Sequence, residues 1–423
     1  MSEDVEAFRR RARDWIHANL QPADYSSWAN SLTGQLSEDE ELAAIQYERQ
    51  LQRRFYDAGY AGICVPEEYG GQGLEPAHQR AFNEELSGFE YPMRLQVPNF
   101  APCAAVILEC GTEAQKKHHL PQILRGEQLW MQLLSEPSGG SDVAAALTTA
   151  TRDGDEWVLN GSKIWTTGAW WSDWGLCLAR TNWDVPKHRG LTVFILPLHQ
   201  DGVDVQRIEM LNGSREFCQE FLVDLRVPDT DRVGEIDQGW TVVTRWMFHE
   251  RMLFNSPLVT APARGRPSAS MVTPSDVARD AGTVDEPVVR DLIGEASVLE
   301  TVGRELQNRV GTGVRTGYLS DQGAAIARLF LGIAGARMRT ICYEIASSAG
   351  GAWLDSDGAR AGRGLDYLMR QAGCIGGGTT EMARNVVSER VLGMPRERSV
   401  DRDVPFRQVP RAPAAGDDTR GNR

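Results

Sequence analysis

Three separate stretches of the chain combine small, hydroxyl and aromatic residues in patterns that suit the binding of a flat, polar ligand. Residues 132–142 read QLLSEPSGGSD, where glycines permit a close backbone approach and serines offer donors. Residues 165–169 read WTTGA, whose indole could stack on a heterocycle while the threonines hydrogen-bond to it. Residues 376–381 read GGGTTE and open a predicted helix, whose N-terminal N–H groups favour an anion.

Each stretch taken alone also fits an ordinary structure. The first reads equally well as an interdomain loop, the second as a strand that enters a turn, and the third as a loop with Thr379 as helix N-cap. Glu250 is a carboxylate that could act as a base, but by itself it is better explained as a helix-surface glutamate paired with Arg245 or Arg251.

Two short sequences that resemble nucleotide-binding loops lack the neighbours that this chemistry needs. Residues 311–313 (GTG) have no preceding strand and no further glycine at Rossmann spacing, and residues 161–163 (GSK) lack the first glycine of a P-loop. The second sequence favours a β hairpin instead. Segments 156–159 and 163–166 flank Asn160-Gly161, a dipeptide typical of two-residue turns.

The chain before about residue 128 has the periodicity of helices. Val5, Phe8, Ala12, Ile16 and Leu20 recur every three to four residues and so share one helix face. A second periodic stretch, 38–58, is followed by the breaker sequence PEEYGGQG at 66–73, and helical pattern resumes at 80–86 and 101–124. We expect an N-terminal helical domain of residues 1–128.

The next part of the chain, residues 129–235, changes to short alternating segments. Besides the segments around residue 160, strands are expected at 191–196, 203–208 and 217–227. This pattern predicts a middle β domain.

Helical periodicity returns after residue 239 and predicts a C-terminal helical domain, 236–397. Helices are expected at 287–314, 321–348 and 381–391. Residues 255–285 are rich in Pro, Ala, Ser, Gly and Thr and predict a long loop. Residues 398–423 predict a tail, disordered from about residue 411.

The composition excludes several classes of protein. A formal net charge of −13 over 423 residues argues against nucleic-acid binding, which needs clustered Lys and Arg. Seven scattered cysteines without a Cys-x-x-Cys pair predict reduced thiols rather than disulfides or a metal site. The charged start MSEDVEAFRRR is not a secretory signal, and no apolar run is long enough to span a bilayer. We therefore expect a cytoplasmic protein.

Several motifs in the same order resemble the acyl-CoA dehydrogenase family. They are PEEYGGQG (66–73), SEPSGGSD (135–142), DGDEWVLNGSKIWTTGA (153–169), EFCQEFLVDLRVP (216–228), GW (239–240) and GGGTTEMARNVVSERVLGMPRE (376–397). The resemblance covers residues from about Phe8 to Glu397. It implies an α+β multi-domain fold with an N-terminal helical domain, a middle β-sandwich or barrel-like domain, and a C-terminal four-helix bundle.

The resemblance also implies a reaction and a cofactor. Members of the family use non-covalently bound FAD to convert an acyl-CoA to the trans-2-enoyl-CoA and pass electrons to an electron-transfer flavoprotein. Positions that match the family's cofactor contacts are Gln132, Leu134, Ser135, Gly140, Ser141, Trp165, Thr167, Thr379 and Glu381. Positions expected to contact the substrate are Ser141, Arg251 and Gly377.

The catalytic base is where this chain departs from many family members. They carry the base within a Tyr-Glu-Gly-Thr loop, where this chain has residues 376–379, GGGT. Other members place the base on a helix of the C-terminal domain, and Glu250 matches that position. The reaction needs a carboxylate to take the Cα proton, so we expect Glu250 to be the base. The missing side chain at Gly377 leaves room for a branched or bulky acyl group, and its N–H could donate to the thioester oxygen.

Two other departures leave alternatives open. Residues 255–285 replace an Arg-x-x-Phe-Gly segment that reaches the flavin of a neighbouring subunit, and residues 348–352 (SAGGA) replace a Gln-x-x-Gly-Gly-x-Gly loop. Some family branches pair two unlike subunits, so a second alternative is a non-catalytic or half-site subunit of a heteromeric acyl-CoA dehydrogenase. In either case the resemblance implies a homo- or hetero-oligomer, a dimer or a tetramer. An oxidase or monooxygenase on the same fold is the third alternative.

Overall fold

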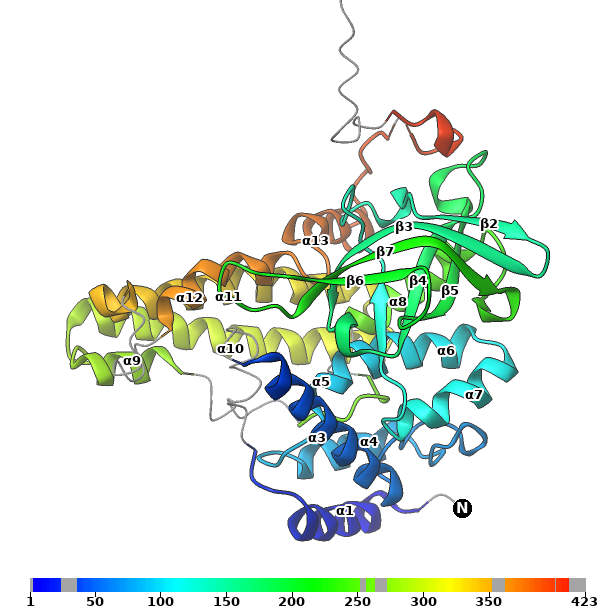
Figure 1. Cartoon of the computed structure of the whole chain (residues 1–423). Coiled ribbons are helices and arrows are strands. Elements are labelled where there is room, and N and C mark those ends of the chain that lie inside the picture. The colour runs from blue at the N-terminus through cyan, green and yellow to red at the C-terminus, as the bar shows by residue number, and fades with distance from the viewer. Residues whose placement is uncertain are drawn as a thin grey trace, which may run out of the picture.

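The computed structural model describes residues 3–23, 36–251, 256–262, 272–351, 362–399 and 401–410. A helical N-terminal region, a β sheet and a helical C-terminal region follow one another along the chain (Figure 1). The long helices of the C-terminal region extend away from the other two parts (Figure 1). The predicted α+β class and its three-part order are confirmed.

The N-terminal region is helical, as predicted. Its elements are α1 (Val5–Asn19), α3 (Glu38–Asp57), α4 (Pro76–Glu85), α5 (Met93–Leu95), the π-helix η2 (Gln96–Ala104), α6 (Ala105–Cys110) and α7 (Glu113–Leu124). The Asp4 carboxylate accepts two N–H groups at the start of α1, which satisfies donors that the helix leaves free. Phe8, Ala12 and Ile16 are buried, so the predicted apolar face of α1 is confirmed.

The middle region is one eight-stranded sheet. Its strands are β1 (Trp130–Leu133), β2 (Thr149–Asp153), β3 (Glu156–Thr167), β4 (Trp174–Arg180), β5 (Leu191–Pro197), β6 (Val203–Ile208), β7 (Phe217–Pro228) and β8 (Arg232–Val233). The order is β6-β7-β3-β2-β4-β5-β8, and β1 pairs with β4 in parallel. The three strands expected at 191–196, 203–208 and 217–227 are present as β5, β6 and β7.

The hairpin predicted at Asn160-Gly161 is wrong. Both residues lie inside the continuous strand β3, and the chain turns earlier, at Gly154 (φ +64°), where β2 pairs with β3. Gly161 is needed for a close approach rather than for a turn, because a Cβ there would lie 2.4 Å from Thr148 Oγ1. The Asn160 side chain hydrogen-bonds to Asp224 across the strands.

The C-terminal region consists of two long helices and several short ones. They are α8 (Gly239–Arg251), α9 (Pro274–Ala281), α10 (Pro287–Arg315), α11 (Ala324–Ala346), α12 (Arg363–Leu368), the 3-10 helix η11 (Met369–Cys374), α13 (Thr380–Val386) and the π-helix η12 (Val387–Val391). The predicted helices at 287–314, 321–348 and 381–391 correspond to α10, α11 and α13 with η12.

The loop predicted over 255–285 is wrong for residues 274–281, which form α9. Thr273 and Asp276 make a capping box, Pro274 occupies the first turn, and Gly282 ends the helix at φ +70°. Val277 is buried against α10 and α11. Local capping and tertiary burial therefore outweigh the loop-like composition. Residues 252–255 and 263–271 lie outside the described part of the chain, as does the predicted disordered end, 411–423.

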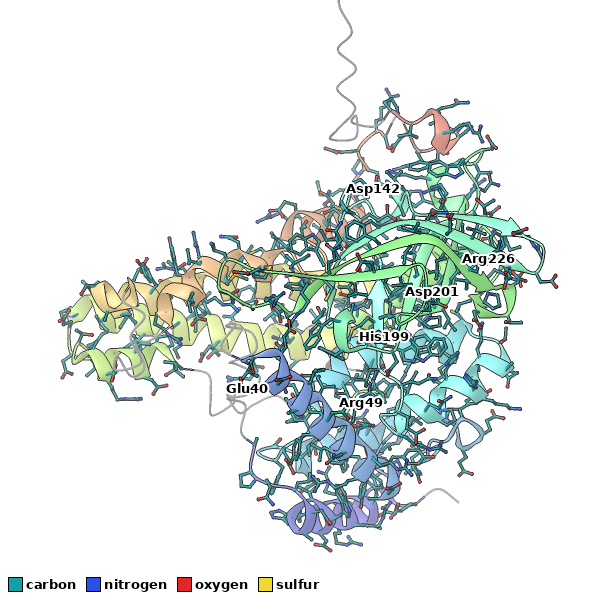
Figure 2. The ribbon with its side chains drawn as sticks, viewed as in Figure 1. Glu40, Arg49, Asp142, His199, Asp201 and Arg226 are labelled. Carbon is teal, nitrogen blue, oxygen red and sulfur yellow. The ribbon has the colours of Figure 1, made fainter. Side chains whose placement is uncertain are left out.

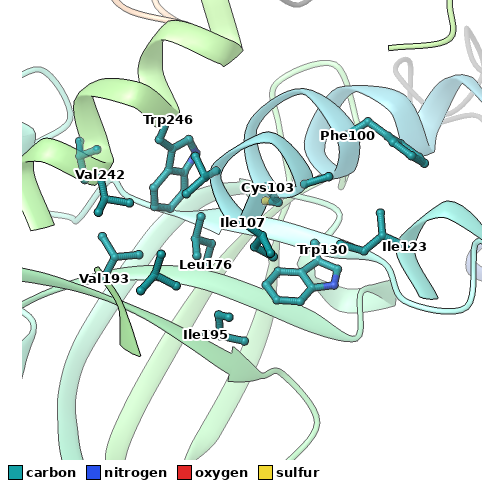
Figure 3. Packing of buried hydrophobic residues seen from close by; sticks show 14 of the residues in the cluster. Phe100, Cys103, Ile107, Ile123, Trp130, Leu176, Val193, Ile195, Val242 and Trp246 are labelled. Atoms are coloured by element: carbon teal, nitrogen blue, oxygen red, sulfur yellow. The ribbon is translucent and has the colours of Figure 1, made fainter. Parts of the chain in front are cut away.

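One hydrophobic core joins the three regions (Figure 3). Cys103 and Ile107 come from the N-terminal helices, Ile195 from the sheet, and Val242 and Trp246 from α8. Because α8 is anchored on both neighbours, it is a rigid support for any side chain near its C-terminal end.

No helix in the described ranges is both long and apolar enough to cross a membrane.

A short C-terminal segment, residues 401–410, packs against the β4–β5 connection. Phe406 is 1 % exposed, stacks on Trp183 and lies under the Arg180 guanidinium, 3.7 Å from its ring centroid. Its N–H donates to Val185 O (2.9 Å). The sequence did not predict that this segment packs on the sheet, because a single buried phenylalanine produces no hydrophobic periodicity.

We expect Phe406→Ala to release residues 401–410 from the β4–β5 connection. Loss of a buried phenyl ring costs about 3 kcal/mol. Since proteolysis follows the population of the open form, tryptic cleavage within the segment should accelerate about a hundredfold. Time-resolved mass spectrometry of the digest measures this rate. Leu392→Ala, at a residue that is 68 % exposed, is the control. Unchanged cleavage of Phe406→Ala would show that the ring does not hold the segment.

Candidate functional site

The end of β1 and the second half of β3 bring two of the predicted cofactor stretches side by side. The Thr166 hydroxyl lies 3.4 Å from Gln132 O, and the Ile164 N–H donates to Ser135 O (3.0 Å). Gln132, Leu134 and Ser135 are half-buried, so their edge is accessible from one side.

Trp165 presents an open aromatic surface at this edge. Its side chain is 52 % exposed, and its backbone has φ +65°, at a register shift between β3 and β7. Thr167 is also exposed, whereas Thr166 between them points inward to Glu220. A positive φ is uncommon for a bulky residue and is found at ligand sites more often than elsewhere. An exposed indole next to a hydroxyl fits a flat heterocycle.

The loop after β1 offers small, exposed groups. Gly140 and Ser141 are exposed, and among the described residues a Cβ on Gly140 would meet only Ser135 Oγ, 3.9 Å away. Asp142, labelled in Figure 2, is bridged to the C-terminal segment by Lys187, whose Nζ lies 2.7 Å from Asp142 and 2.8 Å from Asp401. The C-terminal segment therefore restrains the end of this loop.

A buried ion pair supports both stretches from below. Lys163 (0 % exposed) donates to Glu136 Oε1 at 2.8 Å, and Glu136 also accepts the N–H groups of Leu147 and Thr148. Burial acts to raise the pKa of Glu136, but the Lys163 ammonium and the hydrogen bonds from Leu147 and Thr148 together outweigh it and hold the pKa below its usual range. Sequence patterns did not predict this ion pair. The pattern that could have indicated it is a lysine at an inward position of an alternating strand.

Glu220 is a second buried carboxyl, on β7 opposite Lys163. Its Oε2 accepts from Thr166, while its Oε1 has no partner. Burial raises the pKa of Glu220 to about 8. The carboxyl below the Trp165–Thr167 edge is therefore protonated at neutral pH.

We expect Glu220→Gln to remove a pH dependence of stability. The folded chain binds the Glu220 proton more tightly than the unfolded chain, where the pKa is 4.5. The resulting stabilisation is complete below about pH 4.5 and is lost as the pH rises to 8. At pH 9 the variant should be more stable than the wild type by roughly 2–4 kcal/mol. Urea-unfolding midpoints at pH 6 and pH 9 measure this. Glu156→Gln, at an exposed carboxylate, is the control. If the unfolding midpoints of wild type and Glu220→Gln changed equally between pH 6 and pH 9, Glu220 would not be protonated in the folded chain.

Helix α8 links this edge to the predicted base. The Trp246 indole is fully buried, and its Nε1–H donates to Gln132 Oε1 at 2.6 Å. Glu250 lies four residues further along α8 and therefore on the same face. Gln132 and Glu250, although far apart in sequence, are thus connected through one helix turn.

The two positions considered for the base meet at one place. An ideal Cβ on Gly377 would lie 4.0 Å from Glu250 Oε1 and 3.8 Å from Arg328 Nε. Gly377 has φ +71° and Gly378 has φ +92°, conformations that side-chain-bearing residues rarely adopt. The Glu250 carboxylate, half-buried on α8, therefore occupies the space next to position 377. The side chain of Arg251, expected to contact substrate, lies outside the described residues.

Thr379 and Glu381 have local roles in the structure. The Thr379 hydroxyl caps α13 by accepting the Met382 N–H, and Glu381 bonds with Thr380 and Arg384. Within the described part of the chain, the hydrogen bonds and ion pairs of Thr379 and Glu381 stay within α13 and its cap. The structure therefore does not bring them into contact with Trp165 or Gln132, and their predicted cofactor contacts remain predictions.

The arrangement combines an aromatic edge with hydroxyl and backbone donors and, through α8, a carboxylate at a glycine loop. This fits a flat redox cofactor next to a proton acceptor. No group of three or more His, Cys, Asp or Glu side chains able to hold a metal ion exists among the described residues. All seven cysteines are free thiols; four of them are buried, and Cys64, Cys110 and Cys374 are half-buried.

Comparisons with known proteins match this chain to one protein family. The family model "Acyl-CoA dehydrogenase, N-terminal domain" matches residues 2–127, and "Acyl-CoA dehydrogenase, middle domain" matches residues 132–223. The chain is 31 % identical over 397 residues to acyl-CoA dehydrogenase IpdE1 of Mycobacterium tuberculosis, covering 93 % of this chain and 99 % of the relative. It is 30 % identical to the glutaryl-CoA dehydrogenase of Desulfococcus multivorans over 60 % of this chain and 62 % of that enzyme.

Solved structures share the whole fold. A structure described as the Tcur3481-Tcur3483 steroid ACAD superimposes with a TM-score of 0.71 at 27 % identity, covering 94 % of this chain and 99 % of that one. The ChsE4-ChsE5 complex from Mycobacterium tuberculosis matches with a TM-score of 0.67 at 25 % identity, covering 94 % of this chain and 99 % of that one.

Proposed function

Because the chain belongs to the acyl-CoA dehydrogenase family, a family of FAD-dependent oxidoreductases, we propose that it oxidises an acyl-CoA thioester to the trans-2-enoyl-CoA with Glu250 as the base. The observation that carries this proposal is the position of the Glu250 carboxylate, 4.0 Å from where a side chain at residue 377 would begin. One carboxylate near that point is what proton abstraction requires, and the 376–378 loop itself supplies none.

Each group at the site has a distinct task in this reaction. Glu250 takes the proton from Cα, and the Gly377 N–H donates to the thioester oxygen, which makes that proton more acidic. FAD, when bound, supplies the hydride acceptor for Cβ. Trp165, Thr167 and residues 132–141 would hold the cofactor, with Ser141 also contacting the substrate. Thr379 and Glu381 complete the cofactor site.

We further propose a bulky, polycyclic acyl group. Among the described residues, and apart from the chain neighbours of each glycine, only Arg328 and Glu250 lie within 4 Å of a Cβ on Gly377, and a Cβ on Gly378 would meet nothing within 4 Å. This open loop supports a large group near the α carbon. The structural relative described as a steroid ACAD supports the same substrate class.

Anaerobic titration of the FAD-loaded protein with acyl-CoAs of different shape tests the proposal. The panel comprises short straight-chain, branched, long-chain and steroid-derived thioesters, and the readout is bleaching of the flavin absorbance. We expect the steroid-derived thioester to bleach the flavin fastest and to yield a 2-enoyl product by mass spectrometry. A protein that carries FAD and is bleached by none of them would contradict dehydrogenation. Faster bleaching by a short straight chain would contradict the substrate class alone.

A second candidate is a subunit that is active only with an unlike partner. Two structural relatives are described as pairs of differently named chains, which favours it. In that case the purified chain would be colourless and inert, and a homologous partner chain would restore both FAD and activity. A yellow, active homo-oligomer would exclude the need for a partner. Electron transfer to an electron-transfer flavoprotein and a cytoplasmic location complete the proposal.

A further inference from the structure

We propose that Arg328 is a positioning residue for both the base and the oxyanion donor; this rests on the proposed function. Arg328 lies on α11, outside every motif that the sequence analysis used. Its guanidinium reaches the same point as the Glu250 carboxylate, because its Nε would be 3.8 Å from a Cβ on Gly377.

The first task of Arg328 is to orient the peptide between Gly376 and Gly377. Its Nη2 donates to Gly376 O at 2.7 Å. In a trans peptide the C=O and the following N–H point in opposite directions, so fixing this carbonyl toward α11 turns the Gly377 N–H away from α11. Two glycines with positive φ leave this loop otherwise free to rotate. The hydrogen bond from Arg328 therefore fixes the direction of the Gly377 N–H, the proposed donor to the thioester oxygen.

The second task is electrostatic. The Glu250 charge acts on the Arg328 guanidinium, and Arg328 is half-buried, where such an interaction is stronger than in water. Burial lowers the pKa of Arg328, and the Glu250 charge opposes this. Two thiols are the other titratable groups next to this pair: Cys374 on η11 lies near Arg328, and Cys103 on η2 lies near Glu250. A nearby cation favours the ionised carboxylate, which is the form that accepts a proton.

The surroundings leave a place for the guanidinium. Gly332 lies one turn after Arg328 on α11, and a Cβ there would be 2.8 Å from Arg328 Nη1 and 2.7 Å from Thr380 Cγ2. Glycine at this position thus lets the side chain lie flat between α11 and the 376–378 loop. Gly332→Ala consequently displaces the guanidinium without removing its charge.

Arg328→Gln, Arg328→Lys and Gly332→Ala separate positioning from a purely structural role. Arg304→Gln, at an exposed arginine on α10, is the control. The readout is the rate of anaerobic flavin bleaching as a function of pH, with bound FAD and KM measured in parallel. For Arg328→Gln we expect retained FAD, a KM within about threefold, and a limiting rate lower by about 100-fold. The acid limb of the pH profile, which reports ionisation of the base, should move up by about one pH unit, because the cation that favours the carboxylate is gone.

Arg328→Lys should return the acid limb close to its wild-type position but recover the rate only in part, because an ammonium replaces the charge and not the planar fork. Gly332→Ala should lower the rate and shift the acid limb less than Arg328→Gln does. If Arg328→Gln does not retain FAD, Gly332→Ala and Arg328→Lys together provide the test. An unmoved acid limb in Arg328→Gln, or a rate equal to the wild type, would overturn the inference. A wild-type protein that no acyl-CoA bleaches would instead overturn the proposed function.

Discussion

Glu250→Gln is expected to keep its FAD and to lose flavin bleaching by acyl-CoA, with a rate about 10³-fold below the wild type. The amide has the shape of the carboxylate but cannot accept the Cα proton. Because the cofactor stretches lie on β1 and β3, the variant should bind FAD normally, which the ratio of flavin to protein absorbance measures.

Two further variants make this result specific. Glu250→Asp keeps a carboxylate but withdraws it by one methylene, so its rate should fall between those of the wild type and Glu250→Gln. Glu305→Gln removes an exposed carboxylate from α10 and should have no effect. A Glu250→Gln protein that bleaches within about threefold of the wild-type rate would show that another group is the base.

Lys163→Met is expected to cause the largest loss of stability. Glu136 would then remain as a buried carboxylate without its cation, which costs roughly 3–5 kcal/mol. Glu136 also holds the N–H groups of Leu147 and Thr148, so the 135–148 loop should loosen and release FAD. Urea unfolding and FAD retention on a desalting column measure the two effects.

The double variant Lys163→Met/Glu136→Gln provides the decisive control. Removing both charges should recover much of the stability, because an unpaired buried charge, rather than the missing bond, carries most of the penalty. Arg304→Met, which breaks an exposed pair with Glu305, should be neutral within about 0.5 kcal/mol. Equal loss in the single and double variants would show that the ion pair is not what supports the loop.

Local sequence patterns predicted the main helices and the strands β5, β6 and β7, because their cause is local, whereas β1, β2, β4 and β8 were not predicted. The apolar face of α1 follows from spacing alone, and β5, β6 and β7 follow from alternation. The Asn160-Gly161 turn failed because the demand on Gly161 comes from Thr148, a packing neighbour that a window around residue 160 does not reveal. The α9 helix was missed because its stability depends on burial of Val277 by α10 and α11.

The candidate site shows the same division. The sequence named Glu250 and Gly377 separately, through the family resemblance, but their meeting depends on how α8 and the 376–378 loop pack. Arg328 carried no signal, because an arginine on a long helix is usually a solvated side chain. The support by Lys163 and Glu136 was equally hidden, since β1 and β3 come together only in the folded sheet.

The claim that Glu250 removes the Cα proton is tested most directly by hydrogen exchange at that carbon. FAD-loaded wild type and Glu250→Gln are incubated anaerobically in D2O with excess steroid-derived acyl-CoA, and the recovered thioester is analysed by mass spectrometry. The wild type should introduce deuterium at Cα through reversible proton transfer, and the variant should introduce none above the rate without protein. Exchange by the variant at the wild-type rate would contradict the role of Glu250.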